Sequence, residues 1–111
     1  MRLQVKGKNV EVNAALREYA ESKLKKLDKQ LAPETQVEVE LSEEKNPSIN
    51  AGQVAEATVF AKGTTLRARE ASRDLRTSID ELVHNLERQI QRYRAKRREE
   101  PRRRTTHHNV E

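Results

Sequence analysis

Residues 75–93 read LRTSIDELVHNLERQIQRY, and this stretch decides most of the fold. Its apolar residues recur every three or four positions, the spacing that places side chains on one face of an α-helix. Ser72 or Asp74 is a suitable N-cap, because both side chains accept hydrogen bonds from free backbone N–H groups. The sequence therefore predicts a long amphipathic helix that needs a surface to pack against. Its apolar positions are Leu75, Ile79, Leu82, Val83, Leu86, Ile90 and Tyr93.

A second amphipathic helix is predicted nearer the N-terminus. Asn13 is a good N-cap for it, and Pro33 ends it, because the residue before a proline is disfavoured in the α region. The apolar residues between them recur at helical spacing. They are Leu16, Tyr19, Ala20, Leu24, Leu27 and Leu31.

The remaining apolar residues alternate with polar ones, which is typical of strands with one buried face. Residues 46–52 are expected to form a loop, and Gly63 makes the turn of a hairpin. The first strand is predicted at residues 3–6, ending near the turn-prone residues 7–9, with Val10–Val12 as a short extended piece that is counted as the end of this strand. The other strands are predicted at residues 37–41, 53–62 and 65–69. The order is then β-α-β-β-β-α. It predicts a two-layer α+β fold, with a four-stranded, mainly antiparallel sheet and both helices on one face.

The composition limits the classes of protein that fit. The chain has 111 residues, 33% of them hydrophobic and 37% charged, and no cysteine. One small aliphatic core is expected, and a disulfide scaffold, a thiolate zinc site and a cysteine nucleophile are excluded. The sequence has no apolar run of the ~20 residues that a membrane span needs, and its N-terminus lacks the apolar core of a signal peptide. We therefore expect a cytoplasmic protein without a membrane partner.

The net charge of +5 is concentrated in one half of the chain. Residues 1–63 hold ten Lys and Arg against ten Asp and Glu, whereas residues 64–111 hold thirteen against eight. Apolar periodicity ends near Lys96, and the residues beyond it cannot bury enough surface to fold. The sequence thus predicts a folded domain over residues 1–96 and a disordered basic tail or linker over residues 97–111.

No catalytic constellation is evident. His84 lies beside an apolar face, and His107 and His108 fall in the predicted tail, so they make a poor metal site. The three glycines do not form a phosphate loop. We expect no enzyme activity, no metal, no cofactor and no small-molecule substrate.

Rows of Lys and Arg at helical spacing are the main functional signal. On the helix nearer the C-terminus, Arg88, Arg92 and Lys96 repeat every four residues with no acid among them. These like charges repel one another unless a polyanion binds. The simpler alternative is a solvated helix face. Because Tyr19 and Tyr93 look like core residues, base stacking is not expected, and phosphate contacts to structured RNA fit better. The candidate RNA-binding residues are Lys23, Lys26, Lys29, Arg73, Arg76, Arg88, Arg92 and Lys96.

Four segments carry a resemblance to a known family. They are residues 7–13 (GKNVEVN), 15–19 (ALREY), 57–59 (ATV) and 86–90 (LERQI), supported by Asp74-Leu75 and Ile79-Asp80. In this order, over about residues 1–96, the sequence resembles the ribosome hibernation promoting factors and ribosome-associated inhibitors, once called sigma-54 modulation proteins.

The resemblance implies the fold already predicted and a non-enzymatic function. It implies binding to rRNA of the small ribosomal subunit in the channel for mRNA and tRNA, inhibition of translation, and protection of idle ribosomes under stress or in stationary phase. The positions that match the family's basic contacts are Lys23, Lys26, Arg88 and Arg92. We expect the isolated domain to be monomeric.

The sequence departs from the family pattern at two positions and in its tail. Relatives usually have Lys at the position of Asn85, so one expected phosphate contact is missing here. They often have an aromatic residue at the position of Arg76, and the charge of Arg76 would replace the missing one. The basic tail resembles the linker that leads to a dimerisation domain in long members, so a piece of a long form and a short member with a basic tail both fit.

Two alternative functions remain open. They are a general double-stranded-RNA-binding module and a regulator that acts through protein contacts.

Overall fold

The predicted order of strands and helices is confirmed by the structure, a computed structural model that describes residues 1–45 and 52–110, with side chains up to Arg97. A short 3₁₀ helix follows the first α-helix, and the predicted loop at residues 46–52 lies, except for Gly52, outside the described residues. The elements are β1 (Arg2–Gly7), α1 (Ala14–Leu24), η1 (Lys25–Gln30), β2 (Gln36–Glu43), β3 (Gln53–Ala61), β4 (Thr64–Ser72) and α2 (Leu75–Val110).

The four strands form one mixed sheet in the order β1-β2-β3-β4. β1 pairs with β2 in parallel, so that Val5 lies opposite Val39, and α1 provides the crossover that a parallel connection requires. β2–β3 and β3–β4 are antiparallel hairpin neighbours. The predicted α+β class and the mainly antiparallel sheet are therefore confirmed, with β1 as the parallel exception.

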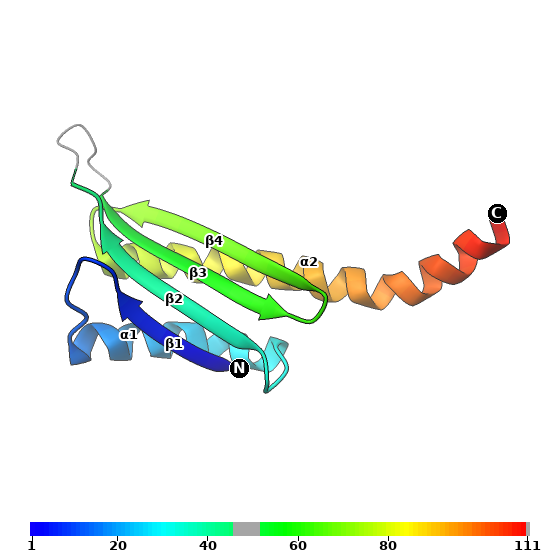
Figure 1. Cartoon of the computed structure of the whole chain (residues 1–111), viewed down its shortest axis with the longest axis horizontal. Helices are drawn as coiled ribbons and strands as arrows, with labels where there is room; N and C mark the ends of the chain where they lie inside the picture. Colours follow the sequence, from blue (N-terminus) through cyan, green and yellow to red (C-terminus); the bar gives the residue numbers. More distant parts are fainter. Residues whose placement is uncertain (46–51, 111) are drawn as a thin grey trace.

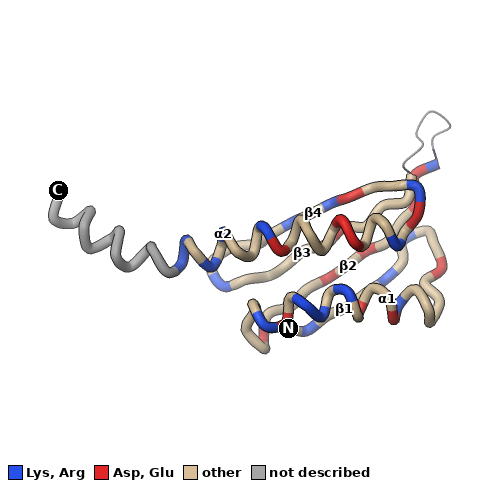
Figure 2. The backbone as a smooth tube through the Cα atoms, turned by 180° about the vertical axis from the view of Figure 1, so that it is seen from behind, with Lys and Arg blue, Asp and Glu red and all other residues tan. Residues whose placement is uncertain are grey.

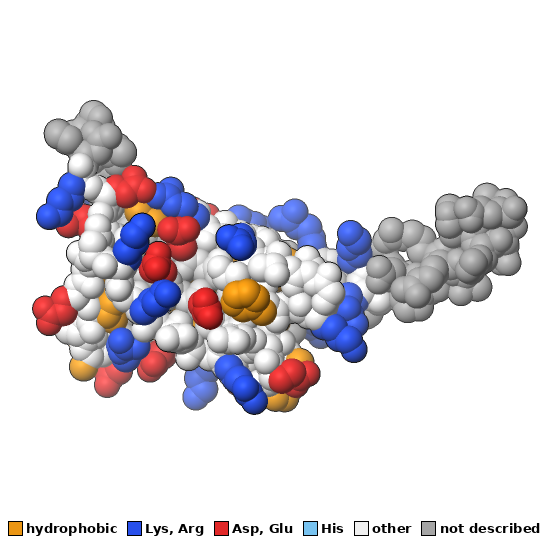
Figure 3. All heavy atoms as spheres, in the orientation of Figure 1, with side chains coloured by type: hydrophobic (Ala, Val, Ile, Leu, Met, Phe, Trp, Pro, Cys, Tyr) orange, Lys and Arg blue, Asp and Glu red, His pale blue; other side chains and the backbone are white. Residues whose placement is uncertain are grey.

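Both helices lie on one face of the sheet, side by side, as Figures 1 and 2 show from opposite sides. α2 packs on β3 and β4, whereas α1 contacts β1 and α2. The other face of the sheet is uncovered. Figure 3 shows Lys, Arg, Asp and Glu side chains intermingled on it.

The core between the two layers is aliphatic. The helices contribute Leu24, Leu82 and Leu86, and the sheet contributes Val39 and Val59, all of them with no exposed surface. The apolar faces predicted for both helices are thus confirmed at most positions. Tyr19 and Tyr93 differ, because both keep part of their surface exposed at the margin of the core.

Both predicted N-caps are present. The Oδ1 atom of Asn13 accepts a hydrogen bond from the backbone N–H of Leu16 at 2.8 Å. At α2 the cap is Asp74, whose Oδ1 atom accepts from the N–H of Thr77 at 2.8 Å. This backbone hydrogen bond, with a second bond from the Thr77 hydroxyl, lowers the pKa of Asp74 below its ordinary value.

The predicted turn at residues 7–9 is confirmed as the end of β1, whereas the prediction that Val10–Val12 belongs to the end of the first strand is wrong. β1 ends at Gly7, where the chain turns so tightly that a Cβ atom would lie 2.3 Å from the carbonyl oxygen of Val10. Only glycine tolerates such an approach. Asn9 then bonds to the backbone of Glu43 through both atoms of its side-chain amide, at 2.7 Å each, and ties this turn to the end of β2.

The boundaries of both helices also differ from the prediction. α1 ends at Leu24, and the chain continues to Gln30 as the 3₁₀ helix η1 rather than as an α-helix. α2 continues past Lys96 to Val110, through an Arg- and Glu-rich stretch that also contains Pro101. The domain boundary at residue 96 and disorder of residues 97–111 in solution stay predictions.

Replacing Leu86 by alanine tests the role of the core. Leu86 is fully buried, so we expect Leu86→Ala to lower the free energy of unfolding by about 2–5 kcal/mol. His84 is exposed on the same helix, and His84→Ala should change it by less than about 0.5 kcal/mol. Urea denaturation followed by circular dichroism measures both. Equal effects of the two substitutions would contradict the assigned core.

Candidate nucleic-acid interface

The eight basic residues singled out from the sequence lie on the elements of the helical layer or on the turn that leads into α2. Lys26 and Lys29 are exposed on η1, and Arg88, Arg92 and Lys96 are exposed on α2. Arg73 precedes α2, and Arg76 lies in its first turn, both exposed. Figure 2 shows Lys and Arg along both helices of this layer, with Asp and Glu among them. The predicted rows therefore lie on the helical layer, with Arg92 and Lys96 at a cavity between α2 and the β3–β4 turn.

Tyr19 brings two of these cations together at the junction of α1 and α2. The guanidinium carbon of Arg76 lies 4.7 Å from the centroid of the Tyr19 ring, and the Nζ atom of Lys23 lies 5.4 Å from it. Both distances are within the range of cation–π attraction. Lys23 from α1 and Arg76 from α2 are thus held around one ring.

Asp80 completes this group of four side chains, the Tyr19 cluster. Its Oδ1 atom accepts a hydrogen bond from the Tyr19 hydroxyl at 2.7 Å and lies 3.9 Å from the Nζ atom of Lys23. The hydrogen bond to the Asp80 carboxylate raises the pKa of Tyr19 above its ordinary value of 10.0. One carboxylate against two cations leaves the cluster with a net positive charge.

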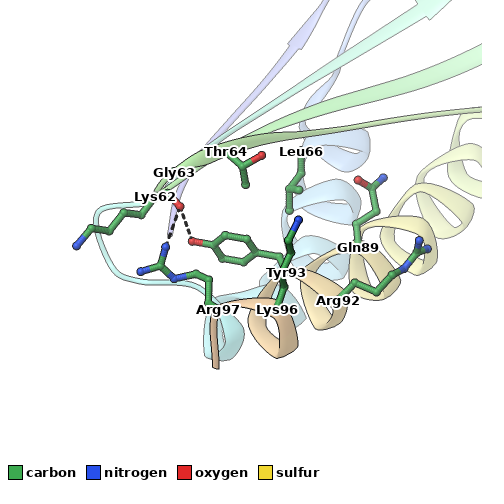
Figure 4. Close-up of a pocket in the computed structure, with 9 residues that line it drawn as sticks. All are labelled: Lys62, Gly63, Thr64, Leu66, Gln89, Arg92, Tyr93, Lys96 and Arg97. Atoms are coloured by element: carbon green, nitrogen blue, oxygen red, sulfur yellow. Dashed lines mark hydrogen bonds between the residues drawn. The ribbon is translucent and has the colours of Figure 1, made fainter. Parts of the chain in front are cut away.

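A second group of cations was only partly predicted. Arg92 and Lys96 line a cavity of about 460 Å³ between α2 and the β3–β4 turn, which we call the turn cleft (Figure 4). Lys62 and Arg97 also line it, and sequence reasoning missed both as site residues. Tyr93 lines it as well, although it was assigned to the core. The helical spacing of Tyr93, Lys96 and Arg97 was the available signal.

Two hydrogen bonds anchor the β3–β4 turn to α2. The Tyr93 hydroxyl donates to the carbonyl oxygen of Lys62 at 2.9 Å, and the Arg97 guanidinium donates to the same oxygen at 3.2 Å. Gly63 follows with a φ of 83°, a conformation that favours glycine. Arg97, the first residue of the predicted tail, thus contacts the folded part of the chain.

Asn85, which the resemblance marks as a departure from the family pattern, has a structural role. Its amide nitrogen donates to the carboxylate of Glu70 on β4 at 2.7 Å, and its oxygen accepts from Gln89 at 2.8 Å. The bond to Glu70 fastens α2 to the sheet, and Gln89 adds a second link by donating to the carbonyl oxygen of Arg67 on β4 at 2.8 Å. Arg76, at the other departure from the family pattern, belongs to the Tyr19 cluster.

Two further observations concern the part of the chain that the structure describes. Within it, no group of three or more His, Asp or Glu side chains is placed to hold a metal ion. Also within it, no helix is both long and apolar enough to cross a membrane.

The family resemblance is confirmed by comparison with known proteins. The model of the family described as "Sigma 54 modulation protein / S30EA ribosomal protein" matches residues 3–98, so the chain belongs to this family. The chain is 39% identical over 97 residues to a ribosome hibernation promotion factor of Picosynechococcus sp., covering 86% of this chain and 50% of the relative. It is 33% identical over 96 residues to a ribosome hibernation promoting factor of Salmonella typhimurium, covering 86% and 96%.

Solved structures agree with these relatives. The N-terminal domain of Thermus thermophilus Protein Y superposes with a TM-score of 0.69 at 34% identity, over 84% of this chain and 99% of that one. A ribosomal subunit interface protein from Coxiella burnetii superposes with a TM-score of 0.71 at 29% identity, over 86% and 99%. The chain spans about half the length of the factors from Picosynechococcus sp. and Lactococcus lactis.

The Tyr19 cluster predicts a shift in one titration. Asp80→Asn removes the carboxylate charge, so the pKa of Tyr19 should fall toward its ordinary value. Because the folded-state pKa of Tyr19 is raised, the hydroxyl–carboxylate bond stabilises the fold below pH about 10 and is lost as the pH rises through the raised pKa. NMR titration of the tyrosine ring carbons measures this pKa. Glu81→Gln, an exposed neighbour, is the control, and an equal fall there would contradict the assignment.

Proposed function

We propose that this chain binds rRNA of the small ribosomal subunit through its helical layer, inhibits translation and promotes ribosome hibernation. The observation that carries the proposal is the presence of exposed basic residues along both helices, in a family whose relatives are named for ribosome hibernation. The residues proposed to bind phosphates are Lys23, Lys26, Lys29, Arg73, Arg76, Arg88, Arg92 and Lys96.

The uncovered face of the sheet supports this orientation. Glu38 and Glu40 on β2 and Glu56 on β3 point to that face, because their neighbours along each strand are buried in the core. These carboxylates lie among cations of the same face: the Nζ atom of Lys6 lies 3.9 Å from Glu40 and the Nε atom of Arg69 lies 3.9 Å from Glu56, so part of the positive charge there is neutralised within the protein. The helical layer is therefore the better side for RNA.

The proposed mechanism of inhibition is steric. Arg side chains bind phosphate oxygens with a planar fork of donors, and Lys binds them as a point charge. A domain held in this way in the channel for mRNA and tRNA occupies space that initiator tRNA needs. Inhibition follows without catalysis, and a ribosome-binding protein of this kind works in the cytoplasm.

Binding to small subunits should depend strongly on salt. With four to eight phosphate contacts, the affinity is expected to fall by roughly two to four orders of magnitude between 50 and 200 mM salt, because binding releases condensed cations. Co-sedimentation with purified small subunits at a series of salt concentrations measures this. An affinity that stays flat over the range would show that the basic rows are only solvated faces.

Reversing one charge on each helical element tests the interface. Lys26→Glu combined with Arg92→Glu should abolish both binding and inhibition of in vitro translation, while circular dichroism shows a retained fold, since both side chains are exposed. Arg2→Glu combined with Arg67→Glu makes the same charge change on the uncovered sheet face and should keep binding within a few-fold. Full inhibition by the folded helical variant would place the site elsewhere.

Competition with duplex RNA separates this proposal from a general double-stranded-RNA-binding module. A ribosome-specific factor stays bound to small subunits when bulk duplex RNA is present in excess. Loss of binding at equal phosphate concentrations of duplex would favour the general module.

A further inference from the structure

The turn cleft is a cavity at one end of the helical layer, and it has a fixed wall. The two hydrogen bonds to the Lys62 carbonyl hold the Tyr93 ring against the β3–β4 turn. The guanidinium carbon of Arg97 lies 5.6 Å from the centroid of that ring. In Figure 4 the ring lies between Arg97 and the side chains of Thr64 and Leu66. The wall is therefore preorganised before any ligand binds.

The lining residues combine two kinds of chemistry. Lys96, Arg92 and Arg97 bring positive charge, and none of the nine lining residues is acidic. Tyr93 and Leu66 bring apolar surface next to these charges. Figure 4 shows the Lys96 side chain extending toward Leu66 and the Arg92 side chain extending along Gln89. Cations beside an aromatic ring suit a ligand with a phosphate at one end and a flat ring at the other.

The volume also fits such a ligand. Sites for small molecules usually measure about 300–1,000 Å³, and the turn cleft measures about 460 Å³. A cavity of this volume can hold one nucleotide but cannot enclose an RNA duplex, which proteins contact along its outer surface. The Thr64 hydroxyl at the turn is a further hydrogen-bonding group for a phosphate or a ribose.

We propose that the turn cleft binds a single nucleotide, with its phosphate at Lys96 and Arg92 and its base against Tyr93 and Leu66. Two sources offer this chemistry: an unpaired nucleotide of an RNA strand and a free nucleoside phosphate. The inference deepens the proposed function and rests on it, because Arg92 and Lys96 belong to both surfaces. It adds base contact to an interface otherwise made of phosphate contacts.

Binding of small probes to the complete 111-residue chain tests the proposal. The probes are inorganic phosphate, adenosine, ADP and a single-stranded RNA tetramer, each titrated while NMR signals of the Gly63, Thr64 and Tyr93 amides are followed. ADP should bind more tightly than phosphate or adenosine, because it uses both ends of the cleft. Tighter binding of the tetramer than of ADP identifies an RNA strand as the source, and the reverse order identifies a free nucleotide.

Variants with matched charge changes separate the cleft from general attraction. Lys96→Gln should weaken ADP binding about tenfold, the loss expected for one charge-assisted hydrogen bond. Thr64→Val, which keeps the net charge and shape, should also weaken it. Lys8→Gln removes an equal charge from an exposed position in the turn after β1 and should leave ADP binding within twofold. Tyr93→Leu should abolish the advantage of ADP over phosphate.

Two outcomes would overturn the inference. One is that phosphate binds as tightly as ADP, and the other is that Lys8→Gln weakens binding as much as Lys96→Gln. The proposed function fails separately, because small-subunit co-sedimentation of the wild-type chain is measured without any probe. Retained subunit binding with no nucleotide binding would reject the turn cleft and leave the ribosome-binding proposal intact.

Discussion

The packing of two apolar helix faces against one side of a four-stranded sheet is the constraint on which the rest of the structure depends. Leu24 of α1 and Leu82 and Leu86 of α2 are fully buried against Val39 and Val59 of the sheet. Since the sheet has only one covered face, α1 and α2 must lie side by side. Their solvated sides then form one continuous layer, and charges far apart in the sequence come to face the same way.

Most of the fold could be predicted because it depends on local patterns. The three-to-four spacing of Ile79, Leu82, Leu86 and Ile90 predicts both the helix and its buried face, and Asn13 and Asp74 mark the starts of the helices. The turn-prone residues 7–9 predict the end of β1, but the exclusion of Val10–Val12 from the sheet could not be predicted from a pattern. It depends on the approach of Gly7 to the carbonyl of Val10 and on the bonds between Asn9 and Glu43, which form only when the sheet is assembled.

Only part of the candidate site could be predicted from the sequence. The exposed positions of Arg88, Arg92 and Lys96 follow from helical spacing alone. The Tyr19 cluster does not, because Lys23, Arg76 and Asp80 meet only after the two helices pack together. The same is true of the turn cleft. Tyr93 and the carbonyl of Lys62 are separated by 31 positions in the chain, and no local pattern brings them into contact.

The orientation of the bound domain is the central claim, and directed cleavage of rRNA tests it most directly. The chain has no cysteine, so a single cysteine can carry a tethered iron chelate that cuts nearby RNA. His84→Cys places the chelate on the helical layer, and Glu56→Cys places it on the uncovered face of the sheet. Cuts in small-subunit rRNA at the channel for mRNA and tRNA should appear strongly from position 84 and weakly from position 56. Strong cuts from position 56 and none from position 84 would contradict the account.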